Sequence, residues 1–160
     1  MAGSPSLTPM RIGLISDTHG LLRPEALSAL EGVDHIIHAG DIGNPGILEE
    51  LAALAPLTAV RGNNDMQKWA ENLPDAVSVE LQGVRVHVLH DFKELRKFPA
   101  PDNTQVIVAG HSHQALISEQ AALLHINPGT AGPRRFKLPV TVALLTIREG
   151  KPQAEIVHLL

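Results

Sequence analysis

Short apolar runs alternate with amphipathic segments over the first 60 residues of the chain. The runs at 11–15, 33–39 and 57–60 have aliphatic residues at their centres and polar residues after them, which is typical of buried strands. The segments between them, 24–30 and 45–54, carry leucines on one side and begin at a proline, a residue that suits the first turn of a helix. The order strand, helix, strand, helix, strand predicts parallel strands joined by crossover helices.

The pattern changes in the second half of the chain, where strands follow one another with few helices. Residues 77–81 and 84–89 flank Gln82-Gly83 and predict an antiparallel hairpin. A short helical segment is expected between Asp91 and Phe98. Five more strands are expected at 105–109, 115–118, 123–126, 140–147 and 154–159.

The domain organisation predicted from the sequence is simple. No internal repeat, low-complexity stretch or linker divides the chain, and its 160 residues suit one domain. We expect a flexible leader over residues 1–9, rich in Gly, Ser, Thr and Pro and without the apolar stretch of a signal peptide. A single domain is expected over residues 10–160.

Composition narrows the class of protein. With 44% hydrophobic and 19% charged residues, the chain has the composition of a folded globular protein. A net charge of −4 and an aromatic content of 2% disfavour nucleic-acid binding by charge or by base stacking. The chain has no cysteine, which excludes disulfides and thiolate metal sites. No apolar run approaches the ~20 residues of a membrane span, and we expect a cytoplasmic protein.

Polar side chains with metal-binding chemistry follow five of the expected strands, at the point where each strand ends. In open α/β sheets ligands bind at the carboxyl ends of the strands, so these side chains are expected to converge. They combine hard oxygen with imidazole nitrogen, a mixture that suits divalent manganese, iron, zinc or nickel. The seven candidate donors are Asp17, His19, Asp41, Asn63, His90, His111 and His113.

Each of these residues also has an ordinary structural interpretation. The two aspartates could be turn residues, Asn63 could form an Asx-turn, and His90 could be structural. Asp91 could orient His90 or cap the segment that follows it. Four further histidines are interpreted as structural and a fifth, His38, as buried or as a support for the ligands. The four are His35, His87, His125 and His158.

In chain order, the motifs D-x-H, G-D, G-N-x-D, a lone histidine and G-H-x-H resemble the calcineurin-like metallophosphoesterase family. They stand at 17–19, 40–41, 62–65, 90 and 110–113. The small size and the segment Asn127-Pro128-Gly129-Thr130 resemble the compact microbial phosphodiesterase subgroup of that family. The resemblance covers about residues 10–160. It implies an α/β fold of two packed mixed β-sheets flanked by helices, an α-β-β-α sandwich.

Carried over by position, the resemblance implies a centre of two divalent metal ions. Manganese is the first candidate, and nickel, iron, zinc and cobalt are alternatives. Asp41 would bridge the two ions, because a carboxylate can span cations ~3.5–4 Å apart. A metal-bridging hydroxide would then attack phosphorus in line. One ion would be held by Asp17, His19 and His113, and the other by Asn63, His90 and His111.

One position departs from the family pattern. Many relatives carry a histidine after the metal-binding asparagine, where it contacts the phosphate or assists the leaving group, and this chain has Asn64 there. An amide donates hydrogen bonds but is no general acid near neutral pH. We therefore expect a metal-dependent phosphodiesterase that acts on diesters or on substrates with good leaving groups, with poor turnover of alkyl monoesters. Asp41 and Asn64 are its catalytic candidates, with Asn64 as a phosphate contact.

The expected partner is a small phosphodiester substrate. Arg134, in a basic group with Arg135 and Lys137, is a second candidate for binding the substrate phosphate. We expect no nucleic acid or membrane as a partner. Pairing of an exposed strand between chains would allow a homo-oligomer.

Other functions remain open from the sequence. The hydrolase could act on phosphomonoesters or on nucleotide polyphosphates. A chain of this fold could also be a non-catalytic scaffold for protein contacts, as the small subunit of the retromer coat is. The complete set of seven donors favours the enzyme, because a scaffold has no need of them.

Overall fold

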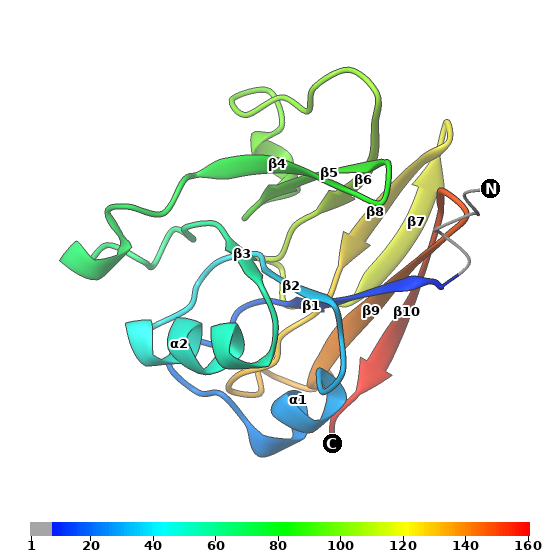
Figure 1. Cartoon of the computed structure of the whole chain (residues 1–160). Helices are drawn as coiled ribbons and strands as arrows, with labels where there is room; N and C mark the ends of the chain where they lie inside the picture. The colour runs from blue at the N-terminus through cyan, green and yellow to red at the C-terminus, as the bar shows by residue number, and fades with distance from the viewer. Residues whose placement is uncertain (1–7) are drawn as a thin grey trace.

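Two five-stranded mixed sheets face each other in the computed structural model of the chain, which describes residues 8–160 (Figure 1). Residues 1–7 of the expected leader lie outside the described residues. The first sheet contains β1 (Met10–Ile15), β2 (His35–His38), β3 (Leu57–Ala59), β9 (Thr141–Arg148) and β10 (Lys151–His158), in the order β10-β9-β1-β2-β3. The second contains β4 (Ala76–Leu81), β5 (Val84–Leu89), β6 (Thr104–Val108), β7 (Leu116–Gln120) and β8 (Leu123–Asn127), in the order β4-β5-β6-β8-β7.

Parallel strands form the centre of each sheet. In the first sheet β1, β2 and β3 are parallel and are joined by the helices α1 (Pro24–Ala29) and α2 (Pro45–Leu54), so the predicted crossover unit is confirmed. The strands β9 and β10 complete this sheet in antiparallel pairing. In the second sheet β5, β6 and β8 are parallel, with β4 and β7 antiparallel at the edges.

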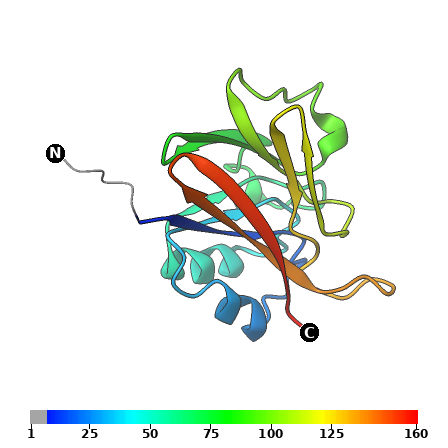
Figure 2. The same cartoon turned by 90° about the vertical axis from the view of Figure 1, so that its right-hand side faces the viewer.

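The predicted hairpin and the predicted fold are both confirmed. The strands β4 and β5 pair with Leu81 opposite Val84, and Gln82 and Gly83 both have positive φ, as a primed hairpin turn requires. The helices α1 and α2 both cover the outer face of the first sheet (Figures 1 and 2). The result is the expected pair of packed mixed sheets with flanking helices. No helix of the described residues is long and apolar enough to cross a membrane.

The helical segment expected between Asp91 and Phe98 is much shorter than predicted. It contains one 3-10 turn, η3 (Phe92–Glu94), and a second such turn, η2 (Lys68–Ala70), precedes β4. Phe92, Leu95 and Phe98 recur every third residue, a spacing that matches the 3.0 residues per turn of a 3-10 helix. These three side chains pack on the outer face of the second sheet, which decides the local conformation.

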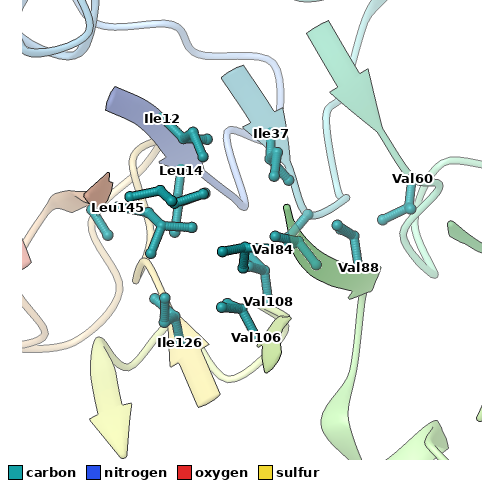
Figure 3. Packing of buried hydrophobic residues seen from close by; sticks show 14 residues of the cluster. Ile12, Leu14, Ile37, Val60, Val84, Val88, Val106, Val108, Ile126 and Leu145 are labelled. Atoms are coloured by element: carbon teal, nitrogen blue, oxygen red, sulfur yellow. The ribbon is translucent and has the colours of Figure 1, made fainter. Parts of the chain in front are cut away.

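The main core lies between the two sheets (Figure 3). Because side chains alternate along a strand, Ile12 and Leu14 of β1 pack in the core between the sheets, while Ile15 belongs to the cluster formed with the helices. Val86 of β5 and Val108 of β6 meet them from the second sheet. Full burial of one such side chain stabilises the fold by about 1.5–3 kcal/mol. This packing fixes the strands whose carboxyl ends carry the candidate donors.

Candidate metal centre

The turns after β1 and β2 remain paired beyond the ends of the two strands. The backbone N–H of Asp17 donates to the carbonyl of Gly40 at 3.0 Å, and the N–H of His19 donates to the carbonyl of Asp41 at 2.9 Å. These two hydrogen bonds continue the parallel pairing of β1 and β2 into the turns that follow them. They hold the backbone of the D-x-H motif against that of the G-D motif.

Backbone conformations that most residues avoid are concentrated among the candidate donors. A positive φ is uncommon outside glycine, and such conformations occur mainly where surrounding structure enforces them, often at functional sites. Five of the seven candidates adopt one. They are Asp17 (56°), His19 (45°), Asp41 (58°), His111 (72°) and His113 (64°).

The Asp17 carboxylate has one satisfied oxygen and one without a partner. Its Oδ2 accepts hydrogen bonds from Ser16 Oγ at 2.7 Å and from the backbone N–H of His111 at 3.1 Å. Its Oδ1 is buried without a hydrogen-bond partner, 3.5 Å from His113 Nε2 and 3.6 Å from His19 Nε2. Buried carboxylate oxygens are rarely left unpaired, so a cation at this point fits the residues present.

The first group of potential ligands is built around this oxygen. Asp17, His19 and His113 each present a ligand atom within 4.8 Å of the other two. The two imidazoles stack with ring centroids 5.2 Å apart, and their Nε2 atoms are 3.4 Å apart. Two nitrogens and one carboxylate oxygen thus converge from the turns after β1 and β6.

A second group, formed by Asp41, His90 and His111, lies beside the first. His90 Nδ1 donates to the carbonyl of Ala39 at 2.8 Å, which leaves Nε2 directed at Asp41 Oδ2, 3.2 Å away. His111 Nδ1 lies 3.4 Å from His90 Nε2 and 3.2 Å from Asn63 Oδ1. Fixing one ring nitrogen through a backbone carbonyl while the other faces a cation is the usual arrangement of histidine ligands.

Asp41 lies between the two groups. Its Oδ2 is 3.2 Å from His90 Nε2 in the second group and 3.7 Å from His19 Nε2 in the first. Asn64 holds the same carboxylate, since its backbone N–H donates to Oδ1 at 2.9 Å and its side-chain amide donates to Oδ2 at 3.1 Å. All seven predicted donors are therefore brought together, with Asn64 in contact with the central carboxylate.

The electrostatics of the two groups favour the charged forms of Asp17, Asp41 and His90, whose pKa values shift in that direction despite burial. Burial by itself would raise the pKa of Asp17 and Asp41, but the neighbouring imidazoles lower both values, that of Asp41 to about 2. Burial would lower the pKa of His90, but the carboxylates of Asp41 and Asp17 raise it to about 9. For His113 burial prevails and lowers the pKa, with a further contribution from the charge of Arg135.

His38 supports both turns without facing either group. Thr18 Oγ1 donates to the carbonyl of Ile42 at 2.8 Å, so it accepts from His38 Nε2 at 3.0 Å. The N–H of Gly40 donates to His38 Nδ1 at 3.1 Å. These contacts require a neutral imidazole protonated on Nε2, and full burial lowers its pKa to about 4. The interpretation of His38 as a buried support agrees with this geometry.

Asp65 is a functional candidate to which the sequence reasoning assigned no role. Its buried carboxylate accepts from the backbone N–H groups of Ile42 at 3.0 Å, Gly43 at 3.2 Å and Gly62 at 2.9 Å. Asp65 therefore clamps the loop after β2 to the loop after β3, on either side of Asp41. The G-N-x-D motif could have indicated this role, because an aspartate in a turn often accepts hydrogen bonds from nearby backbone N–H groups.

The remaining candidates lie around the two groups or away from them. Asp91 caps η3 through the N–H of Lys93, and its Oδ2 lies 3.7 Å from His111 Nε2, so it neighbours His111 and not His90. Arg134 is exposed, and no hydrogen bond or ion pair to the candidate donors is found for it among residues 8–160. His35 bonds Thr58.

Comparison with known proteins identifies relatives over most of the chain. A family model, the calcineurin-like phosphoesterase superfamily domain, matches residues 10–150. A probable metallophosphoesterase of Methanothermobacter thermautotrophicus is 37% identical over 93% of this chain and 92% of its own length. A phosphodiesterase of Methanocaldococcus jannaschii is 29% identical over 92% of this chain and 99% of its own length. Vacuolar protein sorting 29 of Cryptosporidium parvum, at 18% identity and a TM-score of 0.74 over 93% of this chain and 97% of its own, shares the fold.

The neutral, buried His38 predicts a specific loss of stability in acid. Its folded pKa of about 4 lies below its ordinary value of 6.5, so between these pH values the unfolded chain binds more protons than the folded one. The stability that His38 contributes should therefore decline as the pH falls from about 6.5 to about 4. His38→Gln should be less stable than the unaltered protein at pH 7.5, by about 1–3 kcal/mol for the disrupted buried hydrogen bonds.

Urea unfolding of both proteins in chelator at pH 7.5, 6 and 5 measures this difference. The gap between them should shrink as the pH falls, because only the unaltered protein loses the contribution of His38. His158→Gln, the same substitution at an exposed histidine of β10, should produce no such trend. A gap that stays constant with pH would contradict the assignment of a neutral, buried His38.

Proposed function

The chain belongs to the calcineurin-like phosphoesterase superfamily, and on this premise we propose that it is a phosphodiesterase that works with two divalent cations. Membership of this metal-dependent family supports a phosphoester hydrolase, and the structure has candidate metal-binding groups. The proposal goes further, to the number of cations, the roles of single residues and the class of ester.

The observation that carries the proposal is the pair of ligand groups with a carboxylate between them. Asp41 Oδ2 has an imidazole nitrogen of each group within 3.7 Å, so one carboxylate could serve two cations. The partnerless Oδ1 of Asp17 supports a cation in the first group. Two cations ~3.5–4 Å apart are the arrangement that phosphate-ester hydrolases use to hold the attacking and leaving oxygens.

In the proposed centre each residue has a defined task. One cation would be held by Asp17, His19 and His113 and the other by Asn63, His90 and His111, and Asp41 would serve both. Bound cations would supply a water of lowered pKa as nucleophile and positive charge for the phosphoryl oxygens. Manganese is the first candidate, because its preference for oxygen ligands suits the three oxygen donors, and nickel, iron, zinc and cobalt remain alternatives.

The chain's own groups orient this centre. The carbonyl of Ala39 fixes the ring of His90, and Ser16 and the N–H of His111 fix one oxygen of Asp17, so the other oxygen stays directed at the first group. Asn64 holds Asp41 through two hydrogen bonds, and its side-chain amide has a second N–H that would be available to a substrate oxygen. These contacts pre-organise the donors, which reduces the reorganisation needed to bind the cations.

The preference for diesters rests on the chemistry of Asn64. An amide stabilises a phosphoryl oxygen but supplies no proton to a poor leaving group near pH 7. A relative that is 29% identical is named as a phosphodiesterase, which supports the same class of ester. Arg134 as a phosphate contact, a homo-oligomer and a cytoplasmic location stay predictions. The alternative function is a non-catalytic scaffold, and this chain shares its fold with vacuolar protein sorting 29. Measuring the metal content and the hydrolysis of diesters distinguishes a scaffold from an enzyme.

Replacement of Asp41 tests the two-cation proposal. Asp41→Asn should lower kcat on bis(p-nitrophenyl) phosphate by at least about a hundredfold, because loss of a ligand exceeds the 10–100-fold effect of an outer contact. It should also reduce the manganese retained after gel filtration, which elemental mass spectrometry measures. Asp102→Asn removes an exposed carboxylate in a remote loop and should change neither value.

The same measurements on the unaltered protein decide between enzyme and scaffold. Two cations per chain with diester hydrolysis agree with the proposal. A single cation per chain would contradict the dinuclear centre. A protein that retains no metal and stays inert after addition of manganese or nickel would favour the scaffold.

Replacement of Asn64 tests the preference for diesters. Asn64→His introduces a group that can donate a proton, and general acids contribute about 10²–10⁴-fold to rates. The variant should hydrolyse ethyl phosphate at least about tenfold faster than the unaltered protein, with a smaller change on bis(p-nitrophenyl) phosphate, whose leaving group needs no acid. Phosphate release and nitrophenolate absorbance measure the two reactions. Asn64→Gln keeps the amide and should show no gain, and an absence of gain in Asn64→His would refute the explanation.

A further inference from the structure

Phe136 is an aromatic side chain that the fold leaves in solvent. The chain has four aromatic residues, all within the described range. Trp69, Phe92 and Phe98 are partly buried and pack against hydrophobic clusters, whereas Phe136 is 94% exposed. A phenylalanine stabilises a fold by leaving water, so Phe136 contributes almost nothing of this kind to its own chain.

The backbone at Phe136 is also unfavourable for this residue. Its φ is 53°, in the left-handed region that bulky side chains rarely adopt. The surrounding segment, residues 133–138, contains Arg134, Arg135 and Lys137, although the whole chain has a net charge of −4. We call this segment the basic loop. A ring held in solvent between cations, on a strained backbone, has the character of a binding residue.

The segment just before the basic loop is anchored to the turn after β1, which carries Asp17. Thr130 Oγ1 donates to the carbonyl of Asp17 at 3.1 Å, and the N–H of Ala131 donates to the carbonyl of Ser16 at 3.1 Å. Arg23 Nε donates to the carbonyl of Gly132 at 3.1 Å, one residue before the loop begins. Figure 2 shows the segment before β9 projecting from the end of the molecule at which β1 ends. The loop therefore starts from a fixed position beside Asp17.

A further observation connects the loop to a ligand. Phe136, Lys137 and Leu138 line a hollow of about 640 Å³ that is largely open to solvent. The loop thus extends from the candidate centre to a partly apolar hollow.

We propose that the basic loop binds the organic arm of the substrate, with Phe136 stacked on a planar aromatic ring and the positive charge of the loop attracting the phosphate. The substrate class is then phosphodiesters with an aryl or nucleoside arm. This inference rests on the proposed function, because it assumes that the phosphate lies at the metal centre. One exposed ring suits one planar group, whereas a stable protein interface needs about 800 Å² from each partner.

Equilibrium binding of non-hydrolysable probes to the manganese-loaded full chain tests the proposal. Phenylphosphonate and ethylphosphonate carry the same charged head and differ in the ring. By isothermal titration the unaltered protein should bind phenylphosphonate about three- to tenfold more tightly, as expected for one stacked pair. Phe136→Ala should remove this difference by weakening phenylphosphonate alone. Phe136→Trp should preserve it, and so should Leu160→Ala, a control at another exposed apolar residue.

A third probe, the phosphonate analogue of adenosine 5′-monophosphate, distinguishes the two kinds of arm. Dependence of its binding on Phe136 would assign nucleoside diesters, and dependence of phenylphosphonate alone would assign aryl diesters. Equal affinity of the unaltered protein for phenylphosphonate and ethylphosphonate would overturn the proposal. It would also be overturned if Phe136→Ala changed the oligomeric state on gel filtration and not the affinities, since the loop would then contact protein.

The hydrolysis assay separates this inference from the proposed function. If the unaltered protein hydrolyses bis(p-nitrophenyl) phosphate while Phe136→Ala binds all three probes like the unaltered protein, the loop proposal is wrong and the phosphodiesterase proposal stands. If the metal-loaded protein hydrolyses no diester, the proposed function fails and the inference built on it fails as well.

Discussion

The pairing of the turn after β1 with the turn after β2 is the contact on which the candidate centre depends. Beyond the ends of both strands, the N–H groups of Asp17 and His19 still donate hydrogen bonds to the carbonyls of Gly40 and Asp41. This pairing places Asp17, His19 and Asp41 in the left-handed region, a conformation that costs of order 1–3 kcal/mol for each residue. The packed core between the sheets and the Asp65 clamp hold these turns in place.

The chemistry of the centre follows from the charges that this pairing brings together. Two carboxylates and several imidazoles lie in a largely buried space, where an unpaired charge is costly. The pKa of His90 is raised and one oxygen of Asp17 has no hydrogen-bond partner. Both observations indicate that positive charge is favourable between the two aspartates. Divalent cations meet this requirement with several ligands at once, so metal affinity and the stability of these turns are expected to be coupled.

The fold alone does not distinguish a hydrolase from a protein-binding module. The likeness to vacuolar protein sorting 29 of Cryptosporidium parvum, at 18% identity, shows a shared architecture and nothing about activity. Activity depends on the side chains at the strand ends and on the loops beside them. In this chain we expect Asn64, which bonds Asp41, and the basic loop, which follows the segment bonded to Ser16 and Asp17, to bear on the choice of substrate.

The sequence by itself determined the strands, the hairpin at Gln82-Gly83 and the edge at which the seven donors meet, because each donor directly follows a local apolar run. Only the tertiary structure decided that Asp91 neighbours His111, that Asn64 bonds Asp41 and that the segment before Phe98 is a 3-10 turn. Each of these depends on a contact between segments far apart in the chain or on a neighbouring surface. Local periodicity reports which face of an element is buried, but it contains no information about which distant residue that face will meet.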